Sequence, residues 1–167
     1  LFIHETKLKT ISLDSLVLTK LTFSNNFFLK NIHLNNLERL ESLELRQNRL
    51  LEELNYSGKE NLKKLDFFDN LEITNLGLSS FKLIEQLFIQ GAIRIKTLDV
   101  NHLVNLENIV IASCGSLLSM NISDLDKLQH IQIVGNRALY DVSIANMSVL
   151  ESLNIRENNI AILNVEN

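Results

Sequence analysis

The sequence contains no proline and no tryptophan, only five glycines, and a single cysteine among 167 residues. Because proline and glycine mark linkers and domain boundaries, their scarcity predicts one domain over residues 1–167. Cys114 has no partner for an internal disulfide, which excludes a disulfide framework within this chain. No apolar run approaches the roughly 20 residues of a membrane-crossing helix, so no membrane-spanning segment is predicted.

An excess of one charge is also lacking. The chain has 16 Lys and Arg against 20 Asp and Glu, interspersed along its length, so no basic stripe is available for a nucleic acid partner. His4, His33, His102 and His130 show no metal-ligand spacing, and no glycine-rich loop could cradle a phosphate. The sequence therefore predicts no cofactor, no metal and no enzymatic activity.

What the sequence does contain is a pattern that returns every 22 residues. The segment "LESLELRQN" places Leu40, Leu43 and Leu45 before Asn48. Corresponding units begin at Leu18, Leu40, Leu62, Ile84, Leu106, Leu128 and Leu150. Seven copies in register indicate a solenoid, in which each unit forms one coil and neighbouring coils share a core.

The alternation inside each unit predicts its local structure. With the first leucine as position 1, apolar positions 4 and 6 flank an outward position 5, so positions 3 to 7 predict a short strand. Apolar residues return at positions 12, 15, 17 and 20, and segments such as "TLDVN" (97–101) and "SMNIS" (119–123) predict a second short strand or extended segment. The fold class is therefore a repeat solenoid with a parallel sheet, a second extended side and little helix.

The two ends are less regular. Residues 1–15 hold an imperfect earlier unit that is one residue out of step, and the last unit also slips by one residue. The chain starts and stops within repeats and begins with Leu1, so we expect it to be a fragment of a longer array. Uncapped ends would expose leucines and unpaired strand edges, which predicts self-association.

Asparagine dominates position 9, where each coil leaves the first strand. The residues there are Asn26, Asn48, Asn70, Asn136 and Asn158, with Ala92 and Cys114 in the middle. Buried backbone groups at such a turn need partners, and an asparagine side chain offers both donors and an acceptor. We expect an asparagine ladder, a structural role for Cys114, and a weakness or a buried water at Ala92.

The segments "LESLELRQNRLLEEL" and "LENIVIASCGSLLSMNI" resemble the leucine-rich repeat, with its pattern L-x-x-L-x-L-x-x-N/C-x-L. The likeness covers Leu18 to Val165 and is closest to a β-rich, 22-residue subtype; the receptor L-domain is the nearest structural rival. The resemblance implies a right-handed array with a concave parallel sheet, and a protein-recognition scaffold. By the same analogy, a receptor, an adhesin or another surface protein outside the cell is the expected setting.

The residues that face outward from the predicted sheet are the candidates for function. Positions 5 and 7 supply a protein-binding surface of Glu44, Arg46, Asp66, Phe68, Phe88, Val110, Ala112, Val134 and Arg156. Its centre is an apolar strip on successive strands, and charged residues flank it. An apolar patch with a polar rim is typical of a binding surface. The alternative explanation is that strands simply favour phenylalanine and valine.

Two acidic residues, Glu44 and Asp66, occupy the same position on neighbouring strands. Adjacent carboxylates repel each other unless a cation intervenes. They could bind calcium, or Arg46 and Lys64 could neutralise them, and we favour neutralisation.

The leading functional hypothesis is a module that binds a partner protein on the concave sheet. The alternatives are a structural spacer, or a regulatory repeat region of a multidomain protein.

Overall fold

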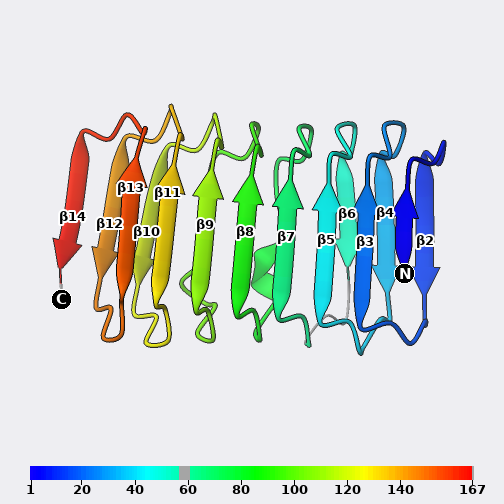
Figure 1. Ribbon diagram of the computed structural model, residues 1–167, viewed down its shortest axis with the longest axis horizontal. Coiled ribbons are helices and arrows are strands. Elements are labelled where there is room, and N and C mark those ends of the chain that lie inside the picture. The colour runs from blue at the N-terminus through cyan, green and yellow to red at the C-terminus, as the bar shows by residue number, and fades with distance from the viewer. Residues whose placement is uncertain (57–60, 167) are drawn as a thin grey trace.

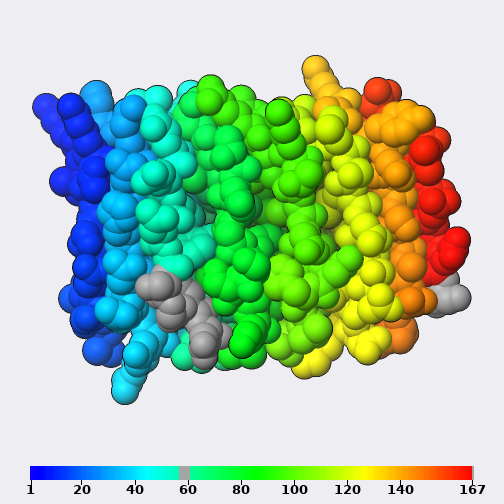
Figure 2. Space-filling model, turned by 180° about the vertical axis from the view of Figure 1, so that it is seen from behind, coloured from blue at the N-terminus to red at the C-terminus, as the bar shows by residue number. Residues whose placement is uncertain are grey.

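The computed structural model describes residues 1–56 and 61–166, which form a right-handed β-solenoid (Figure 1). Each coil rises through a strand in one layer, turns, and descends through the opposite layer. The space-filling view from behind shows the coils following one another in sequence order along the long axis (Figure 2). Contacts therefore form mainly between neighbouring coils, as the repeat predicts.

The first layer, here called the front sheet, is a single parallel sheet in the order β1-β3-β5-β7-β8-β9-β11-β13. Its strands are β1 (Phe2–His4), β3 (Lys20–Ser24), β5 (Ser42–Arg46), β7 (Lys64–Phe68), β8 (Gln86–Gln90), β9 (Asn108–Ala112), β11 (His130–Val134) and β13 (Ser152–Arg156). From β3 onward every strand occupies positions 3 to 7 of its unit, as predicted. The register pairs Leu43 with Leu65 and Leu65 with Leu87, so the predicted period is confirmed.

The core lies between the two layers and is built from columns of equivalent residues. Leu40, Leu62, Ile84 and Leu106 are all completely buried. Burial of each such side chain contributes about 1.5–3 kcal/mol. A single coil could not exclude water from these side chains, so the fold depends on stacking.

The opposite layer, here called the return side, consists of two separate parallel sheets. One contains β2 (Thr10–Asp14), β4 (Asn31–Asn35) and β6 (Glu53–Tyr56); the other contains β10 (Ser119–Ser123), β12 (Asp141–Ala145) and β14 (Ile162–Glu166). At the ends, Ile11 pairs with Ile32 and Val142 with Leu163, which confirms the one-residue slips. One 3-10 turn, η1 (Leu78–Ser80), lies between the two sheets.

The prediction for residues 97–101 left a short strand and an extended segment open, and no strand forms there. Val100 is buried at its predicted position, but this segment is not a strand, whereas the prediction for Ser119–Ser123 is confirmed as β10. The Asp99 side chain accepts a bond from the Asn101 backbone N–H at 3.1 Å. Local bonds of this kind compete with a sheet ladder. This local bond lies where the described part of the return side has no strands, between the sheet that ends with β6 and the sheet that begins with β10.

The predicted asparagine ladder is confirmed, and it holds the turn that follows each front strand. The backbone N–H groups of Asn26 and Asn48 donate to the Oδ1 atoms of Asn48 and Asn70 at 3.2 and 3.0 Å. In the other half of the solenoid, Cys114 and Asn136 donate in the same way to Asn136 and Asn158, both at 2.8 Å. The asparagine Nδ2 atoms donate to backbone carbonyls on the front strand of the preceding coil.

Cys114 is a structural residue of this ladder. It is buried, and its sulfur lies 3.5 Å from the Ala112 carbonyl oxygen. Burial raises the pKa of its thiol to about 11. Hydrogen bonds with the Ala92 and Ala112 backbone lower this pKa, but their effect is weaker than that of burial. A thiol with this pKa is almost entirely protonated near neutral pH, which makes it a poor nucleophile.

A second feature of these turns was not predicted from the sequence. The residue just before the ladder position has positive φ in every coil, and the column comprises Glu5, Asn25, Gln47, Asp69, Gly91, Ser113, Gly135 and Glu157. The left-handed conformation brings the chain sharply out of the front sheet and toward the return side. The available signal was that this column contains no β-branched or large apolar residue.

Candidate functional site

The outward side of the front sheet, here called the sheet face, carries all nine residues of the predicted surface. One row crosses the strands through Glu44, Asp66, Phe88 and Val110, each opposite the next. The second row contains Arg46, Phe68, Ala112, Val134 and Arg156, with Gln90 between Phe68 and Ala112. The period alone was sufficient to place these residues together, because each coil repeats the orientation of the last.

The apolar strip consists of Phe68, Phe88, Val110, Ala112 and Val134, all half-buried on the sheet face. Phe88 lies opposite Val110, and Ala112 lies opposite Val134. Val110 and Ala112 are two residues apart on β9 and join these pairs, while Phe68 is diagonal to Phe88. Directly opposite and diagonal neighbours in a sheet are within reach of each other's side chains. The predicted strip is therefore continuous.

The acidic pair beside the strip is neutralised, as predicted. Arg46 forms a salt bridge with Asp66, and Lys64 lies 3.7 Å from Glu44. Lys20, on the preceding strand, makes the closer contact with Glu44 at 2.8 Å and was not predicted. Lys20 occupies position 3 of its unit, which also faces outward. Including position 3 beside positions 5 and 7 in the sequence analysis could therefore have identified Lys20. Both carboxylates on the strands of this side, Glu44 and Asp66, are thus paired within the protein.

The electrostatics of Glu44 reflect these partners. Burial works against its charge, but the hydrogen bond from Lys20 and the charges of Lys20, Lys64 and Arg46 outweigh that effect, so the pKa of its carboxyl is lowered. The Lys64 ammonium also lies 5.6 Å from the centre of the Phe88 ring, within cation–π range. Lys64 therefore links the ion pairs to the edge of the apolar strip.

Four amide side chains surround the Phe88–Val110 pair, and they were not predicted as site residues. This amide frame consists of Gln86, Gln90, Asn108 and Gln132. Within the described part of the chain, none of the four side chains has a hydrogen-bond partner. All four reach solvent, Gln90 and Gln132 more fully than Gln86 and Asn108. Their outward positions on strands β8, β9 and β11 were the available signal.

The far flank of the surface is more open. Arg156 and Glu157 lie 3.9 Å apart, and their side chains are 65% and 71% exposed. A surface ion pair this exposed contributes little to stability. His130, on β11, is turned outward, and its Nδ1 lies 3.0 Å from the Ser152 hydroxyl.

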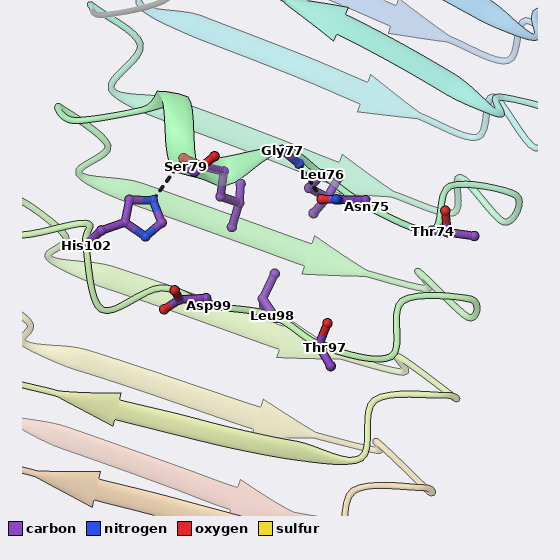
Figure 3. Close-up of a pocket in the computed structure, with 10 residues that line it drawn as sticks. Thr74, Asn75, Leu76, Gly77, Ser79, Thr97, Leu98, Asp99 and His102 are labelled. Atoms are coloured by element: carbon purple, nitrogen blue, oxygen red, sulfur yellow. Dashed lines mark hydrogen bonds between the residues drawn. The ribbon is translucent and has the colours of Figure 1, made fainter.

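The return side carries a separate pocket of about 260 Å³ where its two sheets are interrupted (Figure 3). Thr74, Asn75 and Leu76 line one wall, and Thr97 and Asp99 line the other. His102 Nε2 lies 2.9 Å from the Leu78 carbonyl oxygen. Because a carbonyl can only accept, this nitrogen donates, and the ring has a structural role at the edge of the pocket. The pocket shares no residue with the sheet face.

Over residues 1–56 and 61–166, no cluster of three or more His, Cys, Asp or Glu side chains could hold a metal ion. Among the same residues the structure has no helix with the length and hydrophobicity required to cross a membrane. Comparisons with protein-family models, with curated proteins and with solved structures gave no match.

Proposed function

We propose that this chain is part of a leucine-rich repeat protein, and that its sheet face binds a partner protein. The leucine-rich repeat assignment is supported by the 22-residue register, the leucine columns and the asparagine ladder. The proposal of protein binding depends on one observation above the others: a continuous apolar strip lies on the outer face of the front sheet, beside strands whose carboxylates are already paired.

The dimensions of the sheet face are compatible with this function. Eight strands about 4.8 Å apart span roughly 34 Å, and five residues span about 16 Å, so the flat area is on the order of 500 Å². A standard protein interface buries about 800 Å² on each partner, which the sheet face and adjoining turns could supply. Phe68 and Phe88 would be the anchors, since aromatic residues dominate binding energy at such surfaces.

A pair of matched variants tests the proposal. Phe88→Ala combined with Val110→Glu alters the centre of the strip, whereas Leu118→Glu introduces a charge at an exposed residue of the opposite layer. Each purified protein is immobilised, partner proteins are collected from the source cells, and the retained proteins are compared quantitatively. Circular dichroism and thermal melting show whether each variant keeps the fold.

We expect the wild type and Leu118→Glu to retain the same partner, and the strip variant to lose at least about tenfold in affinity for it. A folded strip variant that retains the same proteins as the wild type would contradict the proposal. That result is expected of a spacer, in which the repeats set a distance and other domains bind.

A further inference from the structure

Resting on this proposed function, we infer that the recognised part of the partner is an uncharged, hydrogen-bonding polypeptide segment, and that the amide frame determines this specificity. The contact would centre on Phe88 and Val110, with the amides of Gln86, Gln90, Asn108 and Gln132 as its polar border.

The two carboxylates on the strands beside the strip are already paired with cations. Glu44 lies between Lys20 and Lys64, and Asp66 is bound by Arg46. Asp66 is only 7% exposed, and the side chain of Glu44 is 13% exposed. A charged partner would have to break these pairs or approach already neutralised groups, so this side of the surface gives little electrostatic attraction to a charged segment.

The four amide side chains of the frame, by contrast, have no hydrogen-bond partner among the described residues. Each carries two N–H donors and one carbonyl acceptor. Gln86 and Gln90 lie two residues to either side of Phe88 on β8, and Asn108 lies two residues before Val110 on β9. Gln132 is directly opposite Val110 on β11. Free hydrogen-bonding groups therefore border the apolar pair on three sides.

These two observations define the chemistry of the partner. Phe88 and Val110 favour an apolar side chain, and their borders favour groups that both donate and accept, such as a peptide backbone or Asn, Gln, Ser and Thr side chains. A buried charge facing neutral amides would lack a counter-ion and would be disfavoured. The frame thus selects against charged segments as well as for neutral ones.

The test uses random 12-residue peptides displayed on phage as the probe. Peptides are selected on the wild-type chain and depleted on Phe88→Asp, with Val110→Asp as a second depletion variant if the first does not fold. Affinities of the enriched peptides are measured by fluorescence anisotropy, in about 50 and about 500 mM NaCl. The measurements are repeated on Gln90→Ala/Gln132→Ala and on the control Asn121→Ala/Asn164→Ala, which removes two exposed amides from the return side.

We expect uncharged peptides to be enriched, with affinities that change less than about twofold with salt. Loss of the two frame amides should weaken binding about tenfold or more, and the control should have no such effect. Enrichment of charged peptides, or a steep salt dependence, would overturn this inference and leave protein recognition standing. Failure to enrich any peptide that distinguishes wild type from the depletion variant would contradict the proposed function itself.

A screen of neutral polysaccharides forms the last arm of the experiment. Hydroxyl groups of sugars also donate and accept hydrogen bonds, so the amide frame could recognise them. Binding of a neutral polysaccharide that depends on Gln90 and Gln132, in the absence of peptide binding, would overturn the assignment to a polypeptide.

Discussion

At the scale of single residues, the buried asparagines make a contribution that no apolar side chain could replace. Asn48 accepts hydrogen bonds from the backbone and side chain of Asn26 at 3.2 and 3.0 Å, and donates to the Phe23 carbonyl at 3.1 Å. We predict that Asn48→Ala lowers the free energy of unfolding by about 2–4 kcal/mol, because several buried polar groups lose their partner at once. Urea denaturation followed by circular dichroism measures this loss.

The matched control is Asn158→Ala, which removes the same side chain nearer the end of the solenoid. Asn158 is half-buried, so water can replace some of its bonds and the loss of stability should be smaller. Equal losses for the two variants would show that the ladder does not depend on burial.

The Glu44 carboxyl gives a prediction for pH. Because its pKa in the folded protein is lowered from its usual value of 4.5, the charged form stabilises the fold. This stability is present above pH 4.5 and is lost as pH falls through the lower pKa of the folded state. The difference in urea midpoint between wild type and Glu44→Gln should therefore shrink as pH is lowered from 7 to about 3. A difference that stays constant would indicate that Lys20 and Lys64 do not stabilise this charge.

At the scale of the strand, the sequence predicts the front sheet better than the return side. The period fixes which residues face the core, and the front strands agree with it at every coil from β3 onward. On the return side, "TLDVN" and "SMNIS" show the same alternation, yet only the second is a strand. Buried Val100 satisfies the pattern without forming a ladder, since alternation reports the direction of side chains and not backbone pairing.

Hydrogen exchange should detect this break. In the described residues, no backbone hydrogen bond involves the N–H groups of Leu98 and Asp99, whereas Ile109 and Ile111 lie within a sheet bonded on both sides. We predict that the amides of Leu98 and Asp99 exchange at least about tenfold faster than those of Ile109 and Ile111, because no ladder has to open first. Similar protection for the four amides, resolved by NMR, would mean that Thr97–Asn101 is paired in solution.

For the candidate site, the sequence predicts which residues face outward but not which side chains contact one another. Nine outward residues could be placed from the period, since every coil repeats the orientation of the one before. The period also places Lys20 and the four amides of the frame outward, but it cannot show that Lys20 contacts Glu44 or that the amides stay unpaired, because both depend on which rotamers long side chains adopt. Spacing defines the rows of the surface, and only coordinates show which polar groups remain available to a partner.

At the scale of the whole molecule, a solenoid buries the interior of each coil against the next, and its two end coils have a neighbour on one side only. At one end Leu8 and Leu16, which continue the buried columns of Leu29 and Leu37, are 42% and 43% exposed, and at the other Leu163 and Val165 are 50% and 51% exposed. β1 and β14 also lie at sheet edges in the described structure, where unpaired backbone groups can accept another strand. The two ends can pack against each other, because each exposes the apolar columns and the parallel strand edge that neighbouring coils bury between them.

The 167-residue chain should therefore associate end to end in solution. Sedimentation velocity over about 1 to 100 μM is expected to show species that grow with concentration, since a head-to-tail contact leaves new ends free. Leu163→Lys combined with Val165→Lys places charges on the last strand and should shift the distribution toward monomer without changing the circular dichroism spectrum. The control Leu118→Lys alters an exposed leucine away from both ends and should associate like wild type. A monomer at every concentration, with terminal amides as protected from exchange as those of β9, would show that the end coils are stable without a neighbour.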